Sequence, residues 1–426
     1  MDVINTFGSV LQKELRRDPD RARKMLLTGF RAYGTWQHVH PDRRLAPSQD
    51  YAADLSMNTM VRALAHPEKS AMCSLFVPGE PLVCAGVTPY SVEAFSSFIS
   101  GTHIEKVFLN ITEEKGFPQT MCSFHRVFLG AAESGLLPTP PFMVYTSLAC
   151  DANLLTFPYI KRKRQMPSFF IDVPYDRNEE SVQDVARQLR NLTEFLQDMT
   201  HRKITDEQLT RTMMRSNRSV SNYQRAQQIL RSRDLPTHMT CDMYGVFTSR
   251  FLMGTKETEK YTKLLLKDAE CAFKSNPESR KLRIAWIHVM PFMQPSMRKL
   301  FNFSGQVYFT GCDIVDDGFQ KGNPNKPYDM MARRLVYSAY NGPAEGRIEA
   351  ARRLIRDTQA EGAVVFTHWG CKTTLGASGL IRDALEADGI PTIVLDGDGC
   401  DPSNSSDGQM TTRMEAFIEM LKEKRQ

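Results

Sequence analysis

Hydrophobic and polar positions alternate with a period that changes three times along the chain, and these changes predict four regions. Residues 1–68 have helical spacing throughout and predict an N-terminal helical segment. Residues 69–178 alternate strand-like and helix-like segments, residues 179–275 are helical again, and residues 276–426 return to the alternation. We therefore expect a first α/β domain, a bridging helical region and a second α/β domain.

Short apolar runs bounded by turn residues predict the strands of both α/β domains. Runs of this kind are typical of strands buried on both faces, as in a parallel sheet. They occupy residues 71–77, 142–147, 168–173, 284–289, 362–367 and 391–395. Their alternation with helices predicts doubly wound parallel sheets. The sequence contains no convincing repeat, although the two α/β units could be alike in structure.

Helices are predicted where apolar residues recur every three or four positions. In the N-terminal segment they cover residues 21–33, with Asp18 or Asp20 as the cap, and residues 50–64. In the bridging region one helical face is formed by Val182, Val185, Leu189, Leu192, Phe195 and Leu196. In the second α/β domain the predicted helices cover residues 346–360, 379–388 and 409–424.

Composition narrows the class of protein. The chain has 426 residues, of which 41% are hydrophobic and 24% charged, as in an enzyme of more than one domain. The net charge of +5 comes from interspersed residues and gives little support to nucleic-acid binding. The N-terminus turns polar within ten residues, so we expect no signal peptide, no membrane span and a cytoplasmic location. Nine cysteines on such a chain indicate reduced thiols or metal ligands rather than disulfides.

Three of the cysteines occupy related positions. Cys150 and Cys371 each follow a predicted strand, at the sheet edge where ligands bind in α/β folds. Cys122 lies at the predicted start of the helix that leads into the first of these strands. A helix N-terminus favours the thiolate form, which suits Cys122 and Cys371 as iron ligands. Three separated thiolates suggest one metal cluster with a vacant corner, because iron–sulfur clusters usually have four cysteine ligands.

Two other interpretations of these cysteines remain open. They could be three unrelated buried thiols, since free cysteine is among the most buried residue types. A zinc site is a weaker alternative, because structural zinc sites generally use closely spaced ligand pairs and this sequence has none.

An ordered set of short motifs from about residue 70 to the end resembles the 2-hydroxyacyl-CoA dehydratase and benzoyl-CoA reductase superfamily. The motifs are residues 73–80 (CSLFVPGE), 122–124 (CSF), 150–152 (CDA), 368–372 (HWGCK), 396–398 (DGD) and 412–417 (TRMEAF). The resemblance implies two flavodoxin-like domains with a 4Fe-4S cluster between them, held by Cys122, Cys150 and Cys371 with one iron open. It also implies a heterodimer with a second, homologous subunit.

The same resemblance suggests further site residues. Ser74 is expected near the open iron or the substrate, and Glu80 and Glu93 are acid/base candidates. His368, beside Cys371, could move a proton or donate a hydrogen bond to a cluster sulfur. For the two glutamates the alternative is a solvated carboxylate at a helix start, and for His368 it is a structural histidine at a strand end.

The reaction implied by the resemblance is loss of water from a 2-hydroxyacyl-CoA to give a 2-enoyl-CoA. Acid–base residues alone cannot remove the unactivated β-hydrogen, whereas one electron added to the thioester carbonyl gives a ketyl radical that expels hydroxide. A separate ATP-dependent iron–sulfur activator would supply that electron, since this chain has no nucleotide loop. Alternatives are a benzoyl-CoA reductase-type or double-cubane-cluster reductase subunit, or a non-catalytic electron-transfer partner.

Overall fold

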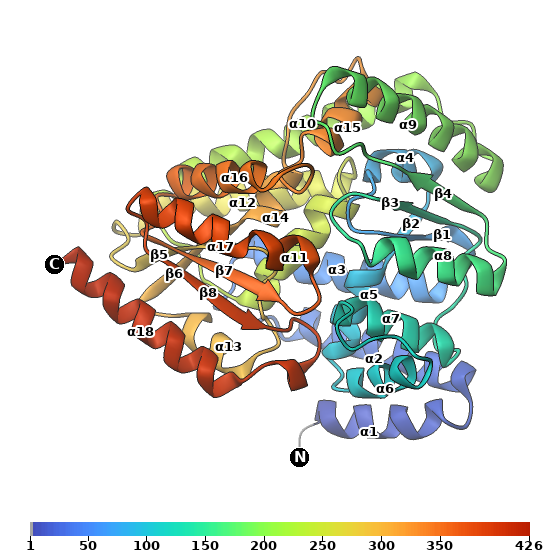
Figure 1. Cartoon of the computed structure of the whole chain (residues 1–426), viewed down its shortest axis with the longest axis horizontal. Coiled ribbons are helices and arrows are strands. Elements are labelled where there is room, and N and C mark those ends of the chain that lie inside the picture. Colours follow the sequence, from blue (N-terminus) through green and yellow to red (C-terminus); the bar gives the residue numbers. More distant parts are fainter. Residues whose placement is uncertain (1–2) are drawn as a thin grey trace.

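Two four-stranded parallel sheets organise the molecule. The computed structural model describes residues 3–426 and places the two sheets side by side, each covered by helices (Figure 1). The first sheet has the order β2-β1-β3-β4 and the second the order β6-β5-β7-β8, with every pair of neighbouring strands parallel. Each is the 2-1-3-4 order of the flavodoxin-like fold. The predicted fold class is confirmed, and the two α/β units are alike in topology.

The strands lie where the apolar runs predicted them, with two exceptions. The bounds are β1 Ser70–Cys73, β2 Thr88–Ser91, β3 Met143–Thr146, β4 Ser168–Ile171, β5 Leu282–Ile287, β6 Val307–Cys312, β7 Gly362–His368 and β8 Thr392–Gly397. No apolar run predicted β2 or β6. Both are edge strands, and β2 contains Pro89, which an edge tolerates because one side of the strand needs no hydrogen-bonding partner.

Three helices form the N-terminal segment: α1 Val3–Leu15, α2 Pro19–Val39 and α3 Pro47–Ala65. The predicted cap of the second helix is Asp18, whose carboxylate accepts hydrogen bonds from the backbone N–H groups of Asp20 and Arg21, both at 3.0 Å. These bonds satisfy donors that the first helical turn otherwise leaves free. Helix α2 extends beyond the predicted residues at both ends.

The bridging region consists of α9 Glu179–Thr200, α10 Asp206–Ile229, α11 Met239–Phe251 and α12 Lys256–Ser275. The predicted apolar face of α9 is buried except at Phe195, which is partly buried. Helix α10 contacts α4 of the first unit and α16 of the second, and α11 and α12 pack on α3. One continuous hydrophobic cluster therefore runs from α1 to α18 through both units, and the exact domain boundaries stay a prediction.

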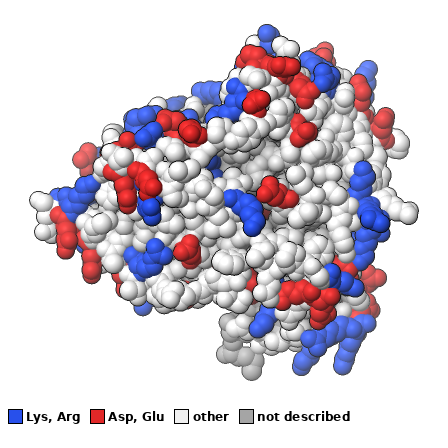
Figure 2. Space-filling view, viewed as in Figure 1, with Lys and Arg blue, Asp and Glu red and all other residues white. Residues whose placement is uncertain are grey.

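The remaining helices flank the two sheets. They are α4 Gly79–Ala85, α5 Val92–Ser100, α6 Glu105–Glu114, α7 Ser123–Glu133, α8 Asn153–Arg164, α13 Pro295–Phe301, α14 Asp313–Gly318, α15 Pro327–Val336, α16 Ala344–Thr358, α17 Lys372–Ala387 and α18 Asp407–Arg425. Helix α17 begins seven residues before the predicted residue 379, directly after Cys371. Positive and negative side chains intermingle on the face shown in Figure 2. Among residues 3–426 no helix is both long enough and apolar enough to cross a bilayer.

Candidate functional site

Of the three cysteines singled out by the sequence, two lie in loops that leave the sheets, and the third lies at the end of the loop between α6 and α7. Cys122 is the residue before α7, Cys150 lies in the loop between β3 and α8, and Cys371 lies between β7 and α17. The first two belong to one α/β unit and the third to the other. The predicted positions at a helix start and after the two strands are therefore confirmed.

The loop that holds Cys371 touches the loops of both other cysteines. The backbone of Gly370 is so close to that of Cys122 that a Cβ built on the glycine would lie 2.6 Å from the Cys122 nitrogen. The hydroxyl of Thr373 donates a hydrogen bond to the carbonyl oxygen of Ala149, at 2.9 Å. The cysteines therefore meet at the boundary between the two α/β units.

Burial in the protein shifts the pKa values of the Cys122 and Cys150 thiols. Burial raises the pKa of Cys122 well above its ordinary value, and negative charge on Cys150 or Cys371 would raise it further. Burial likewise raises the pKa of Cys150. In the chain without a bound group, desolvation opposes the thiolate form of Cys122 that the helix N-terminus favours. A bound cationic centre would reverse the balance, because a coordinating thiol loses its proton.

A buried histidine lies against each of the three sulfurs. The Nε2 atoms of His368, His125 and His288 lie 3.3, 3.4 and 3.5 Å from the Sγ atoms of Cys122, Cys150 and Cys371, respectively. Burial lowers the pKa of His125 to about 3 and also lowers the pKa of the other two. All three imidazoles are therefore neutral at physiological pH.

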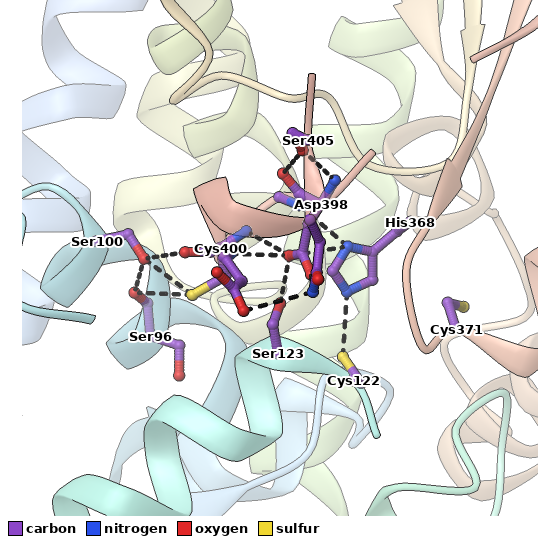
Figure 3. A network of polar contacts seen from close by, with 12 residues as sticks. Ser96, Ser100, Cys122, Ser123, His368, Cys371, Asp398, Cys400 and Ser405 are labelled. Carbon is purple, nitrogen blue, oxygen red and sulfur yellow. Dashed lines mark hydrogen bonds and ion pairs between the residues drawn. The ribbon is translucent and has the colours of Figure 1, made fainter. Parts of the chain in front are cut away.

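A compact polar network fixes the ring of His368 (Figure 3). Its Nδ1 accepts a hydrogen bond from the backbone N–H of Gly399, at 3.1 Å. Asp398 lies beside the ring, and its Oδ1 accepts hydrogen bonds from the backbone N–H groups of Cys400 and Asp401, both at 2.9 Å, and from the Ser123 hydroxyl. Since Ser123 follows Cys122, the network connects the loop after β8 with the start of α7.

Glu93 is the predicted acid/base candidate that the structure places at this site. It lies in the first turn of α5, and one of its carboxylate oxygens is 3.9 Å from Nε2 of His125. The Ser91 hydroxyl donates a hydrogen bond to its other oxygen, at 3.0 Å. Burial raises the pKa of Glu93 to about 7. It is therefore able to exchange a proton near neutral pH.

The other two predicted residues have structural partners. The Ser74 hydroxyl is fully buried and accepts a hydrogen bond from the backbone N–H of Thr146, at 3.1 Å, which connects the ends of β1 and β3. Glu80 forms an ion pair with Arg334 at 2.7 Å and accepts a hydrogen bond from Ser216 at 2.8 Å. It thus binds α4 to α15 and α10, and it has no contact with any of the three cysteines among the described residues.

Sequence reasoning missed three residues of the site. His288 directly follows β5, at the same sheet edge as the cysteines, and that position was the available signal. His125 lies one helical turn after Cys122, so its side chain lies on the same side of α7. For Asp398 the only signal in the sequence was its place in the Asp-Gly-Asp motif, and that motif does not predict a hydrogen-bonding role.

The donor set fits a cluster better than one metal ion. Within residues 3–426, no three His, Cys, Asp or Glu side chains are grouped closely enough to hold a single ion. In an iron–sulfur cluster each thiolate binds a different iron, so the ligands need not converge on one centre. One buried and two partly buried thiols from three loops, each with a neutral imidazole beside it, satisfy that requirement.

Comparison with known proteins identifies the family of the chain. The family model described as 2-hydroxyglutaryl-CoA dehydratase, D-component, matches residues 74–421. The (R)-phenyllactyl-CoA dehydratase alpha subunit of Clostridium sporogenes is 23% identical over 84% of this chain and 91% of its own length. The (R)-2-hydroxyisocaproyl-CoA dehydratase alpha subunit of Clostridioides difficile is 24% identical over 74% of this chain and 81% of its own length. A benzoyl-CoA reductase subunit of Thauera aromatica is 20% identical over 74% of this chain and 79% of its own length. The chain belongs to the family of the 2-hydroxyglutaryl-CoA dehydratase D-component.

Proposed function

We propose that this chain is the iron–sulfur subunit of a 2-hydroxyacyl-CoA dehydratase, in which Cys122, Cys150 and Cys371 hold a 4Fe-4S cluster with one iron free of protein ligands. The meeting of these three cysteines at the boundary between the two α/β units carries the proposal. The dehydratase names of the relatives support the reaction class.

Such a cluster supplies an open coordination position and transfers single electrons to and from a bound thioester. The protein's own part is to hold the three thiolates, to exclude water and to move one proton. Glu93 is the residue we assign to the β-proton of the substrate, because its pKa of about 7 allows it to accept and return a proton at neutral pH. His125 connects Glu93 with Cys150 and so places the proton acceptor beside the cluster ligands.

The proposed assembly contains two further proteins. Relatives are named alpha subunits, which supports a second, homologous subunit. An ATP-dependent iron–sulfur activator would supply the first electron, since the sequence contains no nucleotide-binding loop. The substrate would be a 2-hydroxyacyl-CoA and the product the corresponding 2-enoyl-CoA.

The second candidate function is that of a benzoyl-CoA reductase-type subunit, favoured by the similarity to the Thauera aromatica protein. Such a subunit would add electrons to an aromatic thioester and release no water. Product analysis with a 2-hydroxyacyl-CoA and with benzoyl-CoA therefore separates the two functions. A double-cubane cluster is distinguished by the iron count of the dimer.

The decisive experiment is anaerobic purification of the chain with iron and sulfide analysis. We expect four irons and four sulfides per chain, and formation of a 2-enoyl-CoA when the partner subunit, the activator, ATP and a 2-hydroxyacyl-CoA are added. Cys241→Ala is the matched control, because Cys241 is also a buried cysteine but lies in α11. A colourless, iron-free protein would refute the proposal.

A further inference from the structure

The buried histidine side chains of the described residues lie beside the three cysteines of the site. Of the nine histidines in the sequence, those with buried side chains within residues 3–426 are His125, His288 and His368. They come from α7, from the residue after β5 and from the end of β7, and each contacts a different cysteine of the site. Imidazole is costly to bury, so packing alone does not account for three separate elements that each supply one ring to one sulfur.

The proton of His368 can be placed on the nitrogen that faces the sulfur. Its Nδ1 accepts the N–H of Gly399 and therefore carries no hydrogen. Asp398 Oδ1, 3.6 Å from Nδ1, already accepts two backbone N–H groups. A neutral imidazole has one N–H, so the hydrogen lies on Nε2, directed at Cys122 (Figure 3).

The ring of His125 has the same orientation. Nδ1 of His125 lies 2.8 Å from the Thr156 hydroxyl, which can donate to it and leave the proton on Nε2, toward Cys150. His288 directs Nε2 at Cys371, and its ring also interacts with the backbone of Phe366. His288 also has a φ of 78°, a left-handed conformation that is costly for a residue other than glycine. Strain of this kind is found where a side chain must be held in one place.

Three cysteines outside the site have a hydroxyl or a carbonyl oxygen beside the sulfur, whereas Cys371 has the Thr374 hydroxyl at 3.6 Å in addition to its imidazole. The sulfurs of Cys84 and Cys400 lie 3.4 and 2.8 Å from hydroxyls, and that of Cys312 lies 3.0 Å from a carbonyl oxygen. A carbonyl oxygen only accepts, so it suits a protonated thiol. An N–H group directed at sulfur suits a thiolate, which only accepts.

We propose that His125, His288 and His368 each donate one N–H···S hydrogen bond to a thiolate ligand of the cluster and together raise its reduction potential. The inference rests on the proposed function, because it requires the three cysteines to be ligands. One-electron reduction adds a negative charge to the cluster, and hydrogen bonds to its sulfurs stabilise that charge. The histidines are thus positioning residues that act through the cysteines.

The test replaces each histidine by Gln and by Leu in the full chain, purified anaerobically. Gln can place an amide N–H where Nε2 lies, whereas Leu removes the donor. Iron and sulfide content, the midpoint potential from a dye-mediated titration and the electron paramagnetic resonance spectrum of the reduced protein are measured. Phe124→Leu is the packing control, because this ring lies 5.1 Å from that of His368 and contributes no N–H.

We expect each Leu variant to keep its iron but to have a lower midpoint potential than the wild type, and each Gln variant to recover at least half of that shift. Phe124→Leu should leave the potential unchanged. If a Leu variant does not fold, Asn replaces it, because its shorter side chain does not reach the sulfur. Leu or Asn variants with wild-type potentials, or Gln variants shifted as far as the Leu variants, would overturn this inference alone. A wild-type chain without iron would overturn the proposed function as well.

Discussion

The backbone of Gly370 packs against the backbone of Cys122. A Cβ atom built on Gly370 would lie 2.6 Å from the Cys122 nitrogen. Gly370 also has a φ of +82°, which disfavours any side chain. Gly370→Ala must therefore push apart the loops that carry Cys371 and Cys122. We expect loss of most bound iron together with a lower free energy of unfolding, measured by iron analysis and urea denaturation.

Gly389→Ala is the matched control for that variant. Gly389 has a similar φ of +78°, but its Cβ would meet nothing within 4 Å. It should lose only about 1–2 kcal/mol of stability from the left-handed backbone and keep its iron. Equal iron content in the two variants would show that the close approach of the two loops is not needed.

Each of the three site cysteines should be required for the cluster. We expect Cys122→Ala, Cys150→Ala and Cys371→Ala to lose most or all of the bound iron, because each substitution leaves only two of the three proposed thiolate ligands. Cys241→Ala and Cys271→Ala should keep it, with a stability cost of about 1–3 kcal/mol or less. Full iron retention in Cys150→Ala would contradict the ligand assignment.

Glu93→Gln should separate proton transfer from cluster binding. The amide keeps the shape of the side chain but cannot take a proton, so we expect normal iron content and a turnover lower by about 10²–10⁴-fold. Glu105→Gln is the control, because burial also raises the pKa of Glu105 to about 7 but the residue lies in α6. A similar loss of turnover in both variants would show that the effect is general.

Ser74→Ala tests whether that hydroxyl serves the substrate or the fold. Its hydrogen bond from Thr146 connects β1 and β3, so a structural role predicts a loss of about 1–3 kcal/mol of stability and an unchanged spectral response to substrate. A role near the open iron predicts that iron content is kept and that a 2-hydroxyacyl-CoA perturbs the visible spectrum differently. We expect the second result. A response identical to that of the wild type would assign Ser74 to the fold.

Asp242 should make stability depend on pH. Burial raises its pKa from 3.8 to about 7, and one of its carboxylate oxygens is buried without a hydrogen-bonding partner. The folded state therefore binds the proton more tightly than the unfolded state, so this contribution is complete below pH 4 and is lost as the pH rises through 7. Between about pH 5 and pH 8 the wild type should lose on the order of 2–4 kcal/mol more than Asp242→Asn in urea denaturation. The exposed Asp396, replaced by Asn, serves as the control. Parallel pH profiles for the wild type and Asp242→Asn would contradict the assignment.

The sequence predicted the central strands and the cysteine positions because both have local signals. Buried strands such as β3 and β7 consist mostly of apolar residues, and Cys150 and Cys371 follow these two strands. The edge strand β2 was not predicted, because an edge strand needs fewer apolar residues and tolerates a proline such as Pro89.

His125 and His288 were missed for a different reason. Their role depends on which sulfur each ring meets across the molecule, and His288 and Cys371 are brought together only by the pairing of β5 with β7. The two glutamates show the same limit: Glu80 and Glu93 both begin a helix, yet the first is paired with Arg334 and the second lies beside His125. Position along the sequence does not distinguish them.

The placement of one cysteine on the second α/β unit and two on the first has a consequence for the motions of the protein. Any hinge movement between the units would separate Cys371 from Cys122 and Cys150, and it would break the contacts of Gly370 and Thr373 that connect their loops. A group bound to all three sulfurs would fasten the units together. Opening between the two units would then occur in the apoprotein, and the open conformation would admit iron and sulfide. Loss of the cluster in air would allow the hinge to move again.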